Sequence, residues 1–360
     1  MIVFDAHEDI AWNALTFARD YTRAAHATRR LEAENGSHAP RVNGEATLGL
    51  PDWLLGRVGV VVGTVFVSPA HRSFGAWDTI IYRTPQEAYE QATRQVDYYQ
   101  RFAGECEKID LVLRQSDLDA VLRTWADGAE LADHRVGVIV SMEGADPILE
   151  PKQVEEWFER GVRAVGLAWA ATRYAGGTSE PGPLTDLGRA LLEAMADLGM
   201  ALDLSHAAEE AYLEALDRYE GVVIASHSNP RRFCPTDRGL SDMMIARMAE
   251  RDGVIGIVPY NGFLKPGWRM GRDRKDEVRL ADVAAAIDHV CQVTGSARHV
   301  GIGSDFDGGF GAGHIPEEFD TVADLWNIGK ALAGRGYARE DVEAILSGNF
   351  LRVFRAALPA

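Results

Sequence analysis

The strongest constraint on the fold of this chain is a repeated alternation of short, apolar, β-rich runs with amphipathic stretches. Such an alternation is typical of parallel strands whose connecting helices cover the sheet. The principal strands are predicted at residues 2–6, 59–67, 136–141, 164–168, 201–204, 222–225, 254–259 and 300–304. Eight strand–helix units in a chain of 360 residues predict an α/β fold, the (β/α)8 TIM barrel.

The stretches between these strands have helical periodicity. The predicted helices are residues 85–102, 154–160, 184–198, 207–218, 241–251 and 280–294, followed by a C-terminal helix at 340–357. Residues 109–126 are interpreted as a strand and a helix inserted before the third barrel strand, and the polar residues 20–46 as an excursion above the barrel. Because no repeat and no Pro/Gly/Ser-rich boundary divides the chain, residues 1–360 are predicted to form a single domain.

Composition argues against several classes of partner. The 54 acidic and 37 basic residues give a formal charge of −17, which repels nucleic acid and anionic lipid and most simply serves solubility. An odd number of cysteines, three, with no CxxC pair, indicates a reducing compartment. Without a signal-like N-terminus or a membrane-length apolar run, we expect a cytoplasmic protein with no membrane or nucleic-acid partner. The sequence leaves a homodimer open.

Side chains that can bind a metal directly follow several of the predicted strands. They are His7 and Asp9 after the first strand, Glu143 after the third, His206 after the fifth, His227 after the sixth and Asp305 after the eighth. The carboxyl ends of the strands of such a barrel meet at one rim, where catalytic groups gather. The sequence therefore predicts that these side chains form one site.

Two of the histidines occur in equivalent settings, because residues 202–206 and 224–227 both run from an apolar strand into Ser-His. A single histidine there is more often a satisfied core residue, but the repetition is hard to explain by packing alone. His7 and Asp9 are two apart on an extended segment, so both side chains can reach one cation. Taken alone, this His-x-Asp pair also describes a surface turn.

Two carboxylates have distinct predicted roles. Glu143 ends an apolar strand, where its charge is costly to bury without a partner, and its two oxygens could bridge two cations. The alternative is a buried salt bridge to an arginine. Asp305 is interpreted as the group that takes a proton from the attacking water and returns it to the leaving group. Asp307 is expected only to cap a turn, because Gly309 and Pro316 break the calcium-loop pattern.

As an ordered set, motifs along nearly the whole chain resemble the membrane dipeptidase family, also called renal dipeptidase, a branch of the metal-dependent amidohydrolase barrels. They are DAHED at 5–9, MEG at 142–144, PLTDLG at 183–188, DLSH at 203–206, SHSN at 226–229, GSDFDG at 303–308 and GNFLRVF at 348–354. The resemblance implies that His7 and Asp9 bind one zinc ion, that His206 and His227 bind another, and that Glu143 bridges them. Manganese or cobalt would suit the same ligands.

The resemblance also implies an acid/base role for Asp305 and a grip on the dipeptide carboxylate by Arg238, which from sequence alone is more simply a surface arginine. The family's substrate-polarising histidine aligns with Trp169, whose indole N–H donates one hydrogen bond but cannot titrate. Arg173 and its neighbour Tyr174 lie close enough in sequence to substitute, and Tyr260 is a further candidate substrate contact.

The resemblance thus implies a zinc-dependent dipeptidase for small dipeptides with a free C-terminal carboxylate, with those that carry a C-terminal D-residue among the expected substrates. One alternative keeps the metals but hydrolyses another small amide or a lactone. A second alternative is a non-catalytic metal-binding barrel. Metal content and a substrate panel separate the three.

Overall fold

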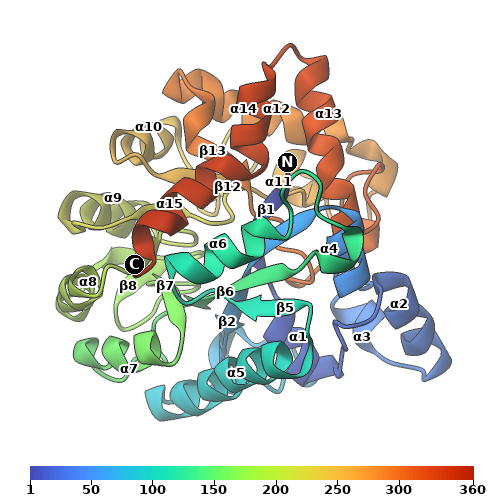
Figure 1. Cartoon of the computed structure of the whole chain (residues 1–360). Helices are drawn as coiled ribbons and strands as arrows, with labels where there is room; N and C mark the ends of the chain where they lie inside the picture. Colours follow the sequence, from blue (N-terminus) through green and yellow to red (C-terminus); the bar gives the residue numbers. More distant parts are fainter.

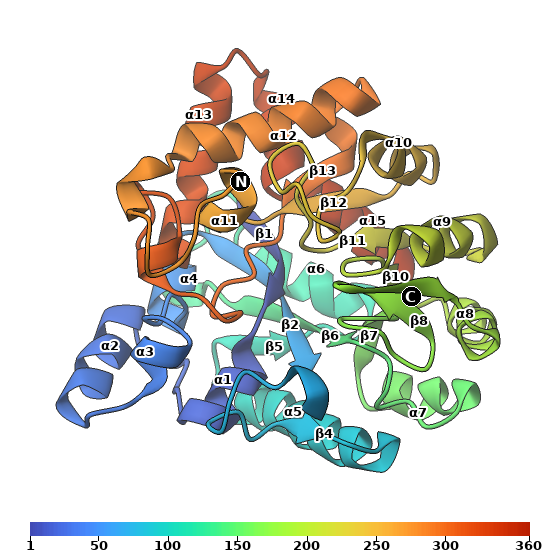
Figure 2. The same cartoon turned by 180° about the vertical axis from the view of Figure 1, so that it is seen from behind.

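The computed structural model describes residues 1–360 and places a parallel barrel inside a ring of helices (Figures 1 and 2). Around the barrel the strands are β1 (Val3–Glu8), β2 (Val58–Phe66), β6 (Val136–Glu143), β7 (Val162–Gly166), β10 (Ala201–Asp203), β11 (Val223–Ala225), β12 (Val254–Ile257) and β13 (Val300–Ile302). Neighbours in this order pair in parallel, and β13 pairs back onto β1 with Ile302 opposite Asp5. The predicted (β/α)8 barrel is confirmed.

The helices of the outer layer connect these strands. They are α1 (Ile10–Phe17), α5 (Pro85–Glu105), α7 (Val154–Glu159), α8 (Asp186–Asp197), α9 (Glu209–Arg218), α10 (Asp242–Glu250), α12 (Leu280–Thr294) and α13 (Asn327–Gly334), with a short α11 (Asn261–Leu264) after β12. Thr84, Thr185 and Ser241 begin three of them by accepting a hydrogen bond from a first-turn N–H with the side chain. The predicted helical ranges agree with these bounds apart from two differences.

Both differences are local breaks in a predicted helix. The helix predicted at 184–198 begins at Asp186, because Leu184 ends β9 (Glu180–Leu184), which pairs antiparallel with β8 (Ala175–Gly177) in a hairpin that was not predicted. The C-terminal helix predicted at 340–357 is divided into α14 (Arg339–Glu343) and α15 (Asn349–Ala357) by a π turn. A further pair of short strands, β3 (Ser68–Pro69) and β4 (Ile81–Tyr82), follows β2.

The predicted insertion before the third barrel strand is confirmed as β5 (Ile109–Leu111) and α6 (Gln115–Arg123). β5 pairs with β6 over 136–138, whereas β7 pairs with β6 from Val140 onward, so the two share one edge of β6. The polar segment 20–46 contains α2 (Ala25–Glu34) and α3 (Ala39–Val42), and α4 (Leu50–Leu55) follows it. Figures 1 and 2 place α2 and α3 beside the barrel, not above it as predicted.

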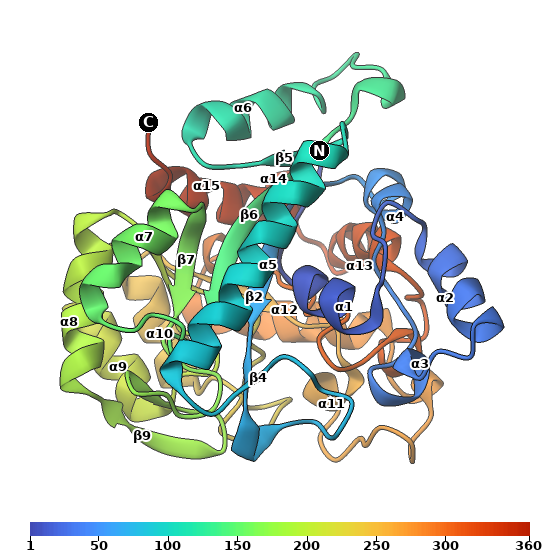
Figure 3. The ribbon, with the colours of Figure 1, turned by 90° about the horizontal axis from the view of Figure 1, so that it is seen from below.

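Apolar side chains fill the N-terminal end of the barrel. Residues from different strands, including Phe4, Val62, Ile139 and Ile224, are fully buried in one cluster with α15. Two phenylalanines of α15 stack on Phe4 at ring-centroid distances of 5.6 and 5.4 Å. In Figure 3, α6 and α15 lie at this end, while β4, β9 and α11 lie at the opposite end. The N-terminal end is therefore closed by packing, and the open rim is the C-terminal one.

None of the helices combines the length and the apolar character needed to cross a membrane.

Candidate metal centre

Toward the C-terminal rim, alternate residues on the barrel strands change from apolar to polar. On β6 the buried Ile139 is followed by Ser141 and Glu143, and on β10 Ala201 is followed by Asp203. Because side chains two residues apart on a strand point to the same side, each strand presents an apolar group deep in the barrel and a polar group near the rim. On these strands the ionisable side chains that point into the barrel therefore lie near the C-terminal rim.

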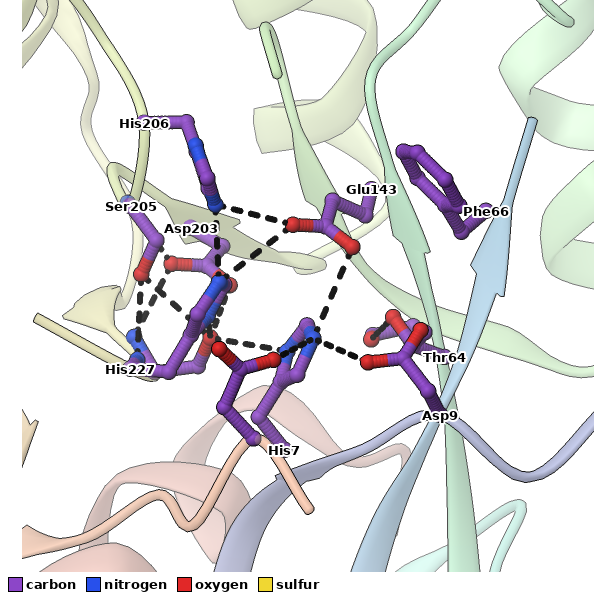
Figure 4. Close-up of polar contacts among 12 residues, drawn as sticks. His7, Asp9, Thr64, Phe66, Glu143, Asp203, Ser205, His206 and His227 are labelled. Atoms are coloured by element: carbon purple, nitrogen blue, oxygen red, sulfur yellow. Dashed lines mark hydrogen bonds and ion pairs between the residues drawn. The ribbon is translucent and has the colours of Figure 1, made fainter. Parts of the chain in front are cut away.

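Glu143 lies at the centre of the polar cluster, between histidines from three other strand ends (Figure 4). Its Oε2 lies 3.5 Å from Nε2 of His7. Its Oε1 lies 3.1 Å from Nε2 of His206 and 3.3 Å from Nε2 of His227. Asp9 adds a carboxylate oxygen 3.7 Å from His7 Nε2. The structure thus brings together all five predicted ligands. One Glu143 oxygen, Oε2, faces His7, and the other, Oε1, faces His206 and His227.

The other ring nitrogens of the histidines contact hydroxyl groups. Nδ1 of His206 lies 2.9 Å from Oγ1 of Thr178. Nδ1 of His227 lies 2.8 Å and Nδ1 of His7 lies 3.3 Å from Oγ of Ser226. Metal-binding histidines commonly use the second nitrogen in this way, which fixes the ring orientation and the tautomer. All three Nε2 atoms are left to face Glu143.

Asp203 determines which way the Ser226 hydroxyl points. One Asp203 oxygen accepts the backbone N–H groups of Ser205 and Ser226, at 2.9 and 3.0 Å, and the other accepts the Ser226 O–H. Because that hydroxyl donates to Asp203, its oxygen is left to accept from Nδ1–H of His7 and His227. The lone pair of each Nε2 is then free for a cation.

The donor set fits divalent cations. Nε2 of His7 is buried without a hydrogen-bond partner, and the Nε2 atoms of His206 and His227 lie 3.0 Å apart. A ligated cation satisfies such nitrogens, and imidazole with carboxylate suits zinc and related ions. Groups of potential ligands whose atoms lie within 4.8 Å of one another are His7, Asp9 and Glu143; Glu143, His206 and His227; and His7, His227 and Asp305.

The electrostatics of the site favour positive charge. Burial lowers the pKa of His7, but the charges of Glu143, Asp9 and Asp305 outweigh burial and raise it to about 10. Burial raises the pKa of Asp305 to about 7, while the neighbouring His7 lowers it. A cation bound here would replace the proton that these carboxylates attract to His7.

Two site residues have left-handed backbone angles that non-glycine residues seldom adopt: His206 with φ 65° and Asp305 with φ 57°. The backbone N–H of Asp305 donates to the carbonyl of His7 at 2.9 Å, which ties the end of β13 to that of β1. Only glycine suits position 308, because a Cβ there would lie 2.3 Å from Oδ1 of Asp305 and 2.7 Å from Oδ2 of Asp9. The backbone is shaped around these carboxylates.

Arg238 is buried beside the metal centre, with 7% of its surface exposed, so its interpretation as an ordinary surface arginine is wrong. One terminal nitrogen donates to Oγ of Ser228 at 3.1 Å, and the other donates to the backbone carbonyl of His227. Burial lowers the pKa of Arg238. A guanidinium fixed in this way can receive an anionic group of a ligand.

The other predicted substrate contacts differ in position. Trp169 lines the site, but Arg173 is turned away, with Nε 3.3 Å from Asp146 and further hydrogen bonds to the carbonyls of residues 146, 148 and 149. Tyr174 is also turned away and donates its hydroxyl to the carbonyl of Ile148. The structure therefore does not bring Arg173 or Tyr174 to the place of the missing histidine. Tyr260 packs against Phe263 and does not line the cavity.

The metal centre forms the floor of a cavity of about 270 Å³. The cavity is lined by Asp9, Trp12, Phe66, Phe74, Glu143, Trp169, Thr178, His206, Arg238, Phe263, Asp305, Gly308 and Gly309. Its three carboxylates all belong to the metal centre, and five of its lining residues are hydrophobic. A small molecule with a polar middle and apolar substituents suits such a cavity.

Sequence reasoning missed several residues that support the site. Thr178, Asp203 and Ser226 contact the histidines or orient their partners. Asp203 carried a signal, as an acidic residue on an apolar strand three positions before a predicted ligand. Asp307 is not a turn cap, because it is fully buried and pairs with Arg19 at 3.0 Å.

A model of the membrane dipeptidase family, peptidase family M19, matches residues 1–359. The chain belongs to this family. Membrane dipeptidases of family M19 are metallopeptidases, so the chain is a hydrolase of the metallo-dipeptidase type, whose family implies a divalent metal.

Curated relatives named as dipeptidases agree with this assignment. Dipeptidase tcpJ of Claviceps purpurea is 28% identical over 83% of this chain and 67% of its own length. Dipeptidase 3 of Rattus norvegicus is 28% identical over 69% of this chain and 51% of its own length. The chain thus spans about half to two thirds of the length of these relatives.

Two solved structures share the fold. The dipeptidase AC, a metallopeptidase of family M19, matches with a TM-score of 0.78 and 22% identity over 100% of this chain and 99% of its own. A metallopeptidase from Rhodobacter sphaeroides, solved with a phosphinate mimic of the dipeptide L-Ala-D-Ala, matches with a TM-score of 0.77 and 21% identity over 99% of both chains.

Proposed function

We propose that this chain is a dipeptidase that uses two divalent ions, with zinc preferred. His7 and Asp9 would hold one ion, His206 and His227 the other, and Glu143 would bridge them. The observation that carries this proposal is the position of Glu143, which directs Oε2 to His7 and Oε1 to His206 and His227. Three histidines with carboxylates form a ligand set that zinc favours.

Two bound ions would activate the attacking water and polarise the carbonyl of the scissile amide. The protein would contribute Asp305, whose carboxylate lies 3.9 Å from Nε2 of His7 and lines the cavity. Asp305 would take a proton from the water and deliver it to the departing amine. Thr178 and Ser226 would hold the histidine rings in place through their hydroxyls.

Arg238 would bind the free C-terminal carboxylate of the dipeptide. The fixed guanidinium lines the cavity near the metal centre and is itself buried, which strengthens its attraction for an anion. The D-configured end of the phosphinate mimic bound by the Rhodobacter sphaeroides protein makes dipeptides with a C-terminal D-residue part of this proposal.

The experiment combines elemental analysis of the purified protein with a panel of L,L- and L,D-dipeptides, their C-terminal amides, and small lactones. We expect two divalent ions per chain and metal-dependent hydrolysis of dipeptides but not of their amides. Hydrolysis of lactones alone would replace the dipeptidase assignment with the alternative of another binuclear hydrolase. One ion or none, together with no hydrolysis, would point to a non-catalytic barrel.

Variants assign the roles within that experiment. Asp305→Asn should lower kcat by about 10²–10⁴ while both ions remain bound, because only the proton transfer is lost. Arg238→Ala should raise KM for free-carboxylate dipeptides. Unchanged kcat in the Asp305 variant would remove that residue from proton transfer, and unchanged KM in the Arg238 variant would remove the arginine from carboxylate binding.

A further inference from the structure

Four aromatic rings lie together on one side of the cavity: Trp12, Phe66, Phe74 and Trp169. Trp169 packs edge-on against Phe66 and Phe74 at centroid distances of 5.1 and 5.6 Å. Trp12 lies 6.1 Å from Phe66 and 6.0 Å from Phe74. We call these four residues the aromatic wall.

Phe66, in the aromatic wall, belongs to a strand on the far side of the barrel from Arg238. Phe66 ends β2, whereas Arg238 lies in the connection after β11, and these two strands are diametrically opposed in the closed barrel. Trp169 reaches the metal centre itself, with its ring 6.1 Å from that of His206. A dipeptide with its carboxylate at Arg238 and its scissile carbonyl above Glu143 would therefore direct its amino-side residue toward the aromatic wall.

The wall is chemically suited to an apolar group. No carboxylate of the cavity lies outside the metal centre, and the hydroxyl of Thr178 is already engaged by His206. Phe74 keeps 44% of its surface exposed at the rim, where a ligand could cover it. Burial of such surface is favourable in proportion to its apolar area.

We propose that the aromatic wall is a subsite for a large apolar or aromatic side chain on the amino side of the scissile bond, and that Trp169 determines this specificity. This inference rests on the proposed dipeptidase function. Trp169 thereby acts as a wall of the substrate site, and a free amino group on the substrate contributes less to binding than the side chain does.

The test uses phosphinate dipeptide analogues that share an alanine-like carboxyl side and carry either a benzyl or a methyl group on the amino side. Binding to the zinc-loaded protein is measured by calorimetry, and kcat/KM is measured for Phe-Ala and Ala-Ala. We expect the benzyl analogue to bind at least about tenfold more tightly, with a similar preference in kcat/KM. In Trp169→Ala the preference should fall to about threefold or less.

Controls separate this subsite from general damage. Trp169→Phe should retain most of the preference. Trp326→Ala, at a tryptophan that contacts Arg57 and lies outside the cavity, should retain all of it. Circular dichroism of each variant checks the fold. A benzyl analogue without the amino group should bind nearly as well as its parent, and a large loss there would show that the rings hold the ammonium instead.

The outcomes distinguish this inference from the proposed function. Equal affinities for the two analogues, with metal-dependent dipeptide hydrolysis intact, would overturn the aromatic subsite alone. A clear benzyl preference without hydrolysis of any dipeptide would support the subsite and overturn the dipeptidase assignment. Binding of neither analogue would overturn the subsite.

Discussion

Asp203 acts on the metal centre through its neighbours, because its two oxygens position the backbone and hydroxyl of Ser226 against the histidines. In Asp203→Asn, an amide would present an N–H where one oxygen now accepts, and the Ser226 hydroxyl would lose its fixed direction. We expect zinc affinity to fall by about 10–100-fold with the fold intact. A competitive chelator titration measures this affinity, with the exposed Asp197→Asn as control. Unchanged affinity would remove Asp203 from any role at the centre.

Residue positions explain how much of the site could be predicted. Residues that directly follow a barrel strand are placed at the rim by topology alone, so all five predicted ligands could be located from sequence. Side-chain partners such as Thr178 depend on loop conformation and could not. For the same reason the sequence did not reveal that Arg173 is held by Asp146, away from the cavity.

At the scale of elements, Asp307 joins the rim to the segment beside the barrel. Its carboxylate pairs with Arg19, accepts the hydroxyl of Tyr21, and accepts the backbone and hydroxyl of Thr47. Asp307→Ala should lower the free energy of unfolding by about 3–5 kcal/mol, because Arg19 would keep only Glu32 as an ionic partner and the buried hydroxyls of Tyr21 and Thr47 would lose their acceptor. Urea unfolding of the metal-free protein measures this change.

The matched control for this change is Asp276→Ala, which breaks a solvent-exposed pair with Arg274 and should change stability little. If both variants unfold at the same urea concentration as the parent, the Asp307 network does not anchor the segment.

His134 lies between the inserted α6 and β6, and its ring stacks on Trp125, which follows α6, at a centroid distance of 3.9 Å. Burial, with Arg57 and Lys108 nearby, lowers the pKa of His134. Since the unfolded chain then binds this proton more tightly, stability should fall as the pH drops through about 6.5. His134→Gln cannot titrate and should lose less stability than the parent between pH 7.5 and 5.5, as measured by urea unfolding in chelator. Identical losses would contradict this.

The elements that could be predicted were those with strong periodicity. The eight barrel strands follow from short apolar runs, such as those of β1 and β2, that are buried along their whole length, and α12 follows from the one apolar face that it buries. The β8–β9 hairpin was missed, since Ala175–Gly177 and Glu180–Leu184 are rich in glycine and proline and have no strand-like alternation. The π turn before α15 has no sequence signal that we recognise.

At the scale of the whole molecule, the barrel is closed by packing at one end and carries a cluster of carboxylates at the other. Asp9, Glu143 and Asp305 repel one another without a cation, and a cation that binds only the folded state stabilises it. Removing metal with a chelator should therefore lower Tm, and zinc should restore it. At zinc concentrations of 1,000 times Kd the gain is about 4 kcal/mol for each ion bound. Zinc should raise the Tm of Glu143→Gln less than it raises the Tm of the parent. An equal rise in Tm would mean that zinc binds elsewhere.

The most direct test of the central claim is an anomalous difference map, recorded at the zinc edge from crystals of the zinc-loaded protein. Our account predicts two peaks on either side of Glu143, one beside His7 and Asp9 and the other beside His206 and His227. A single peak, or peaks away from Glu143, would contradict it.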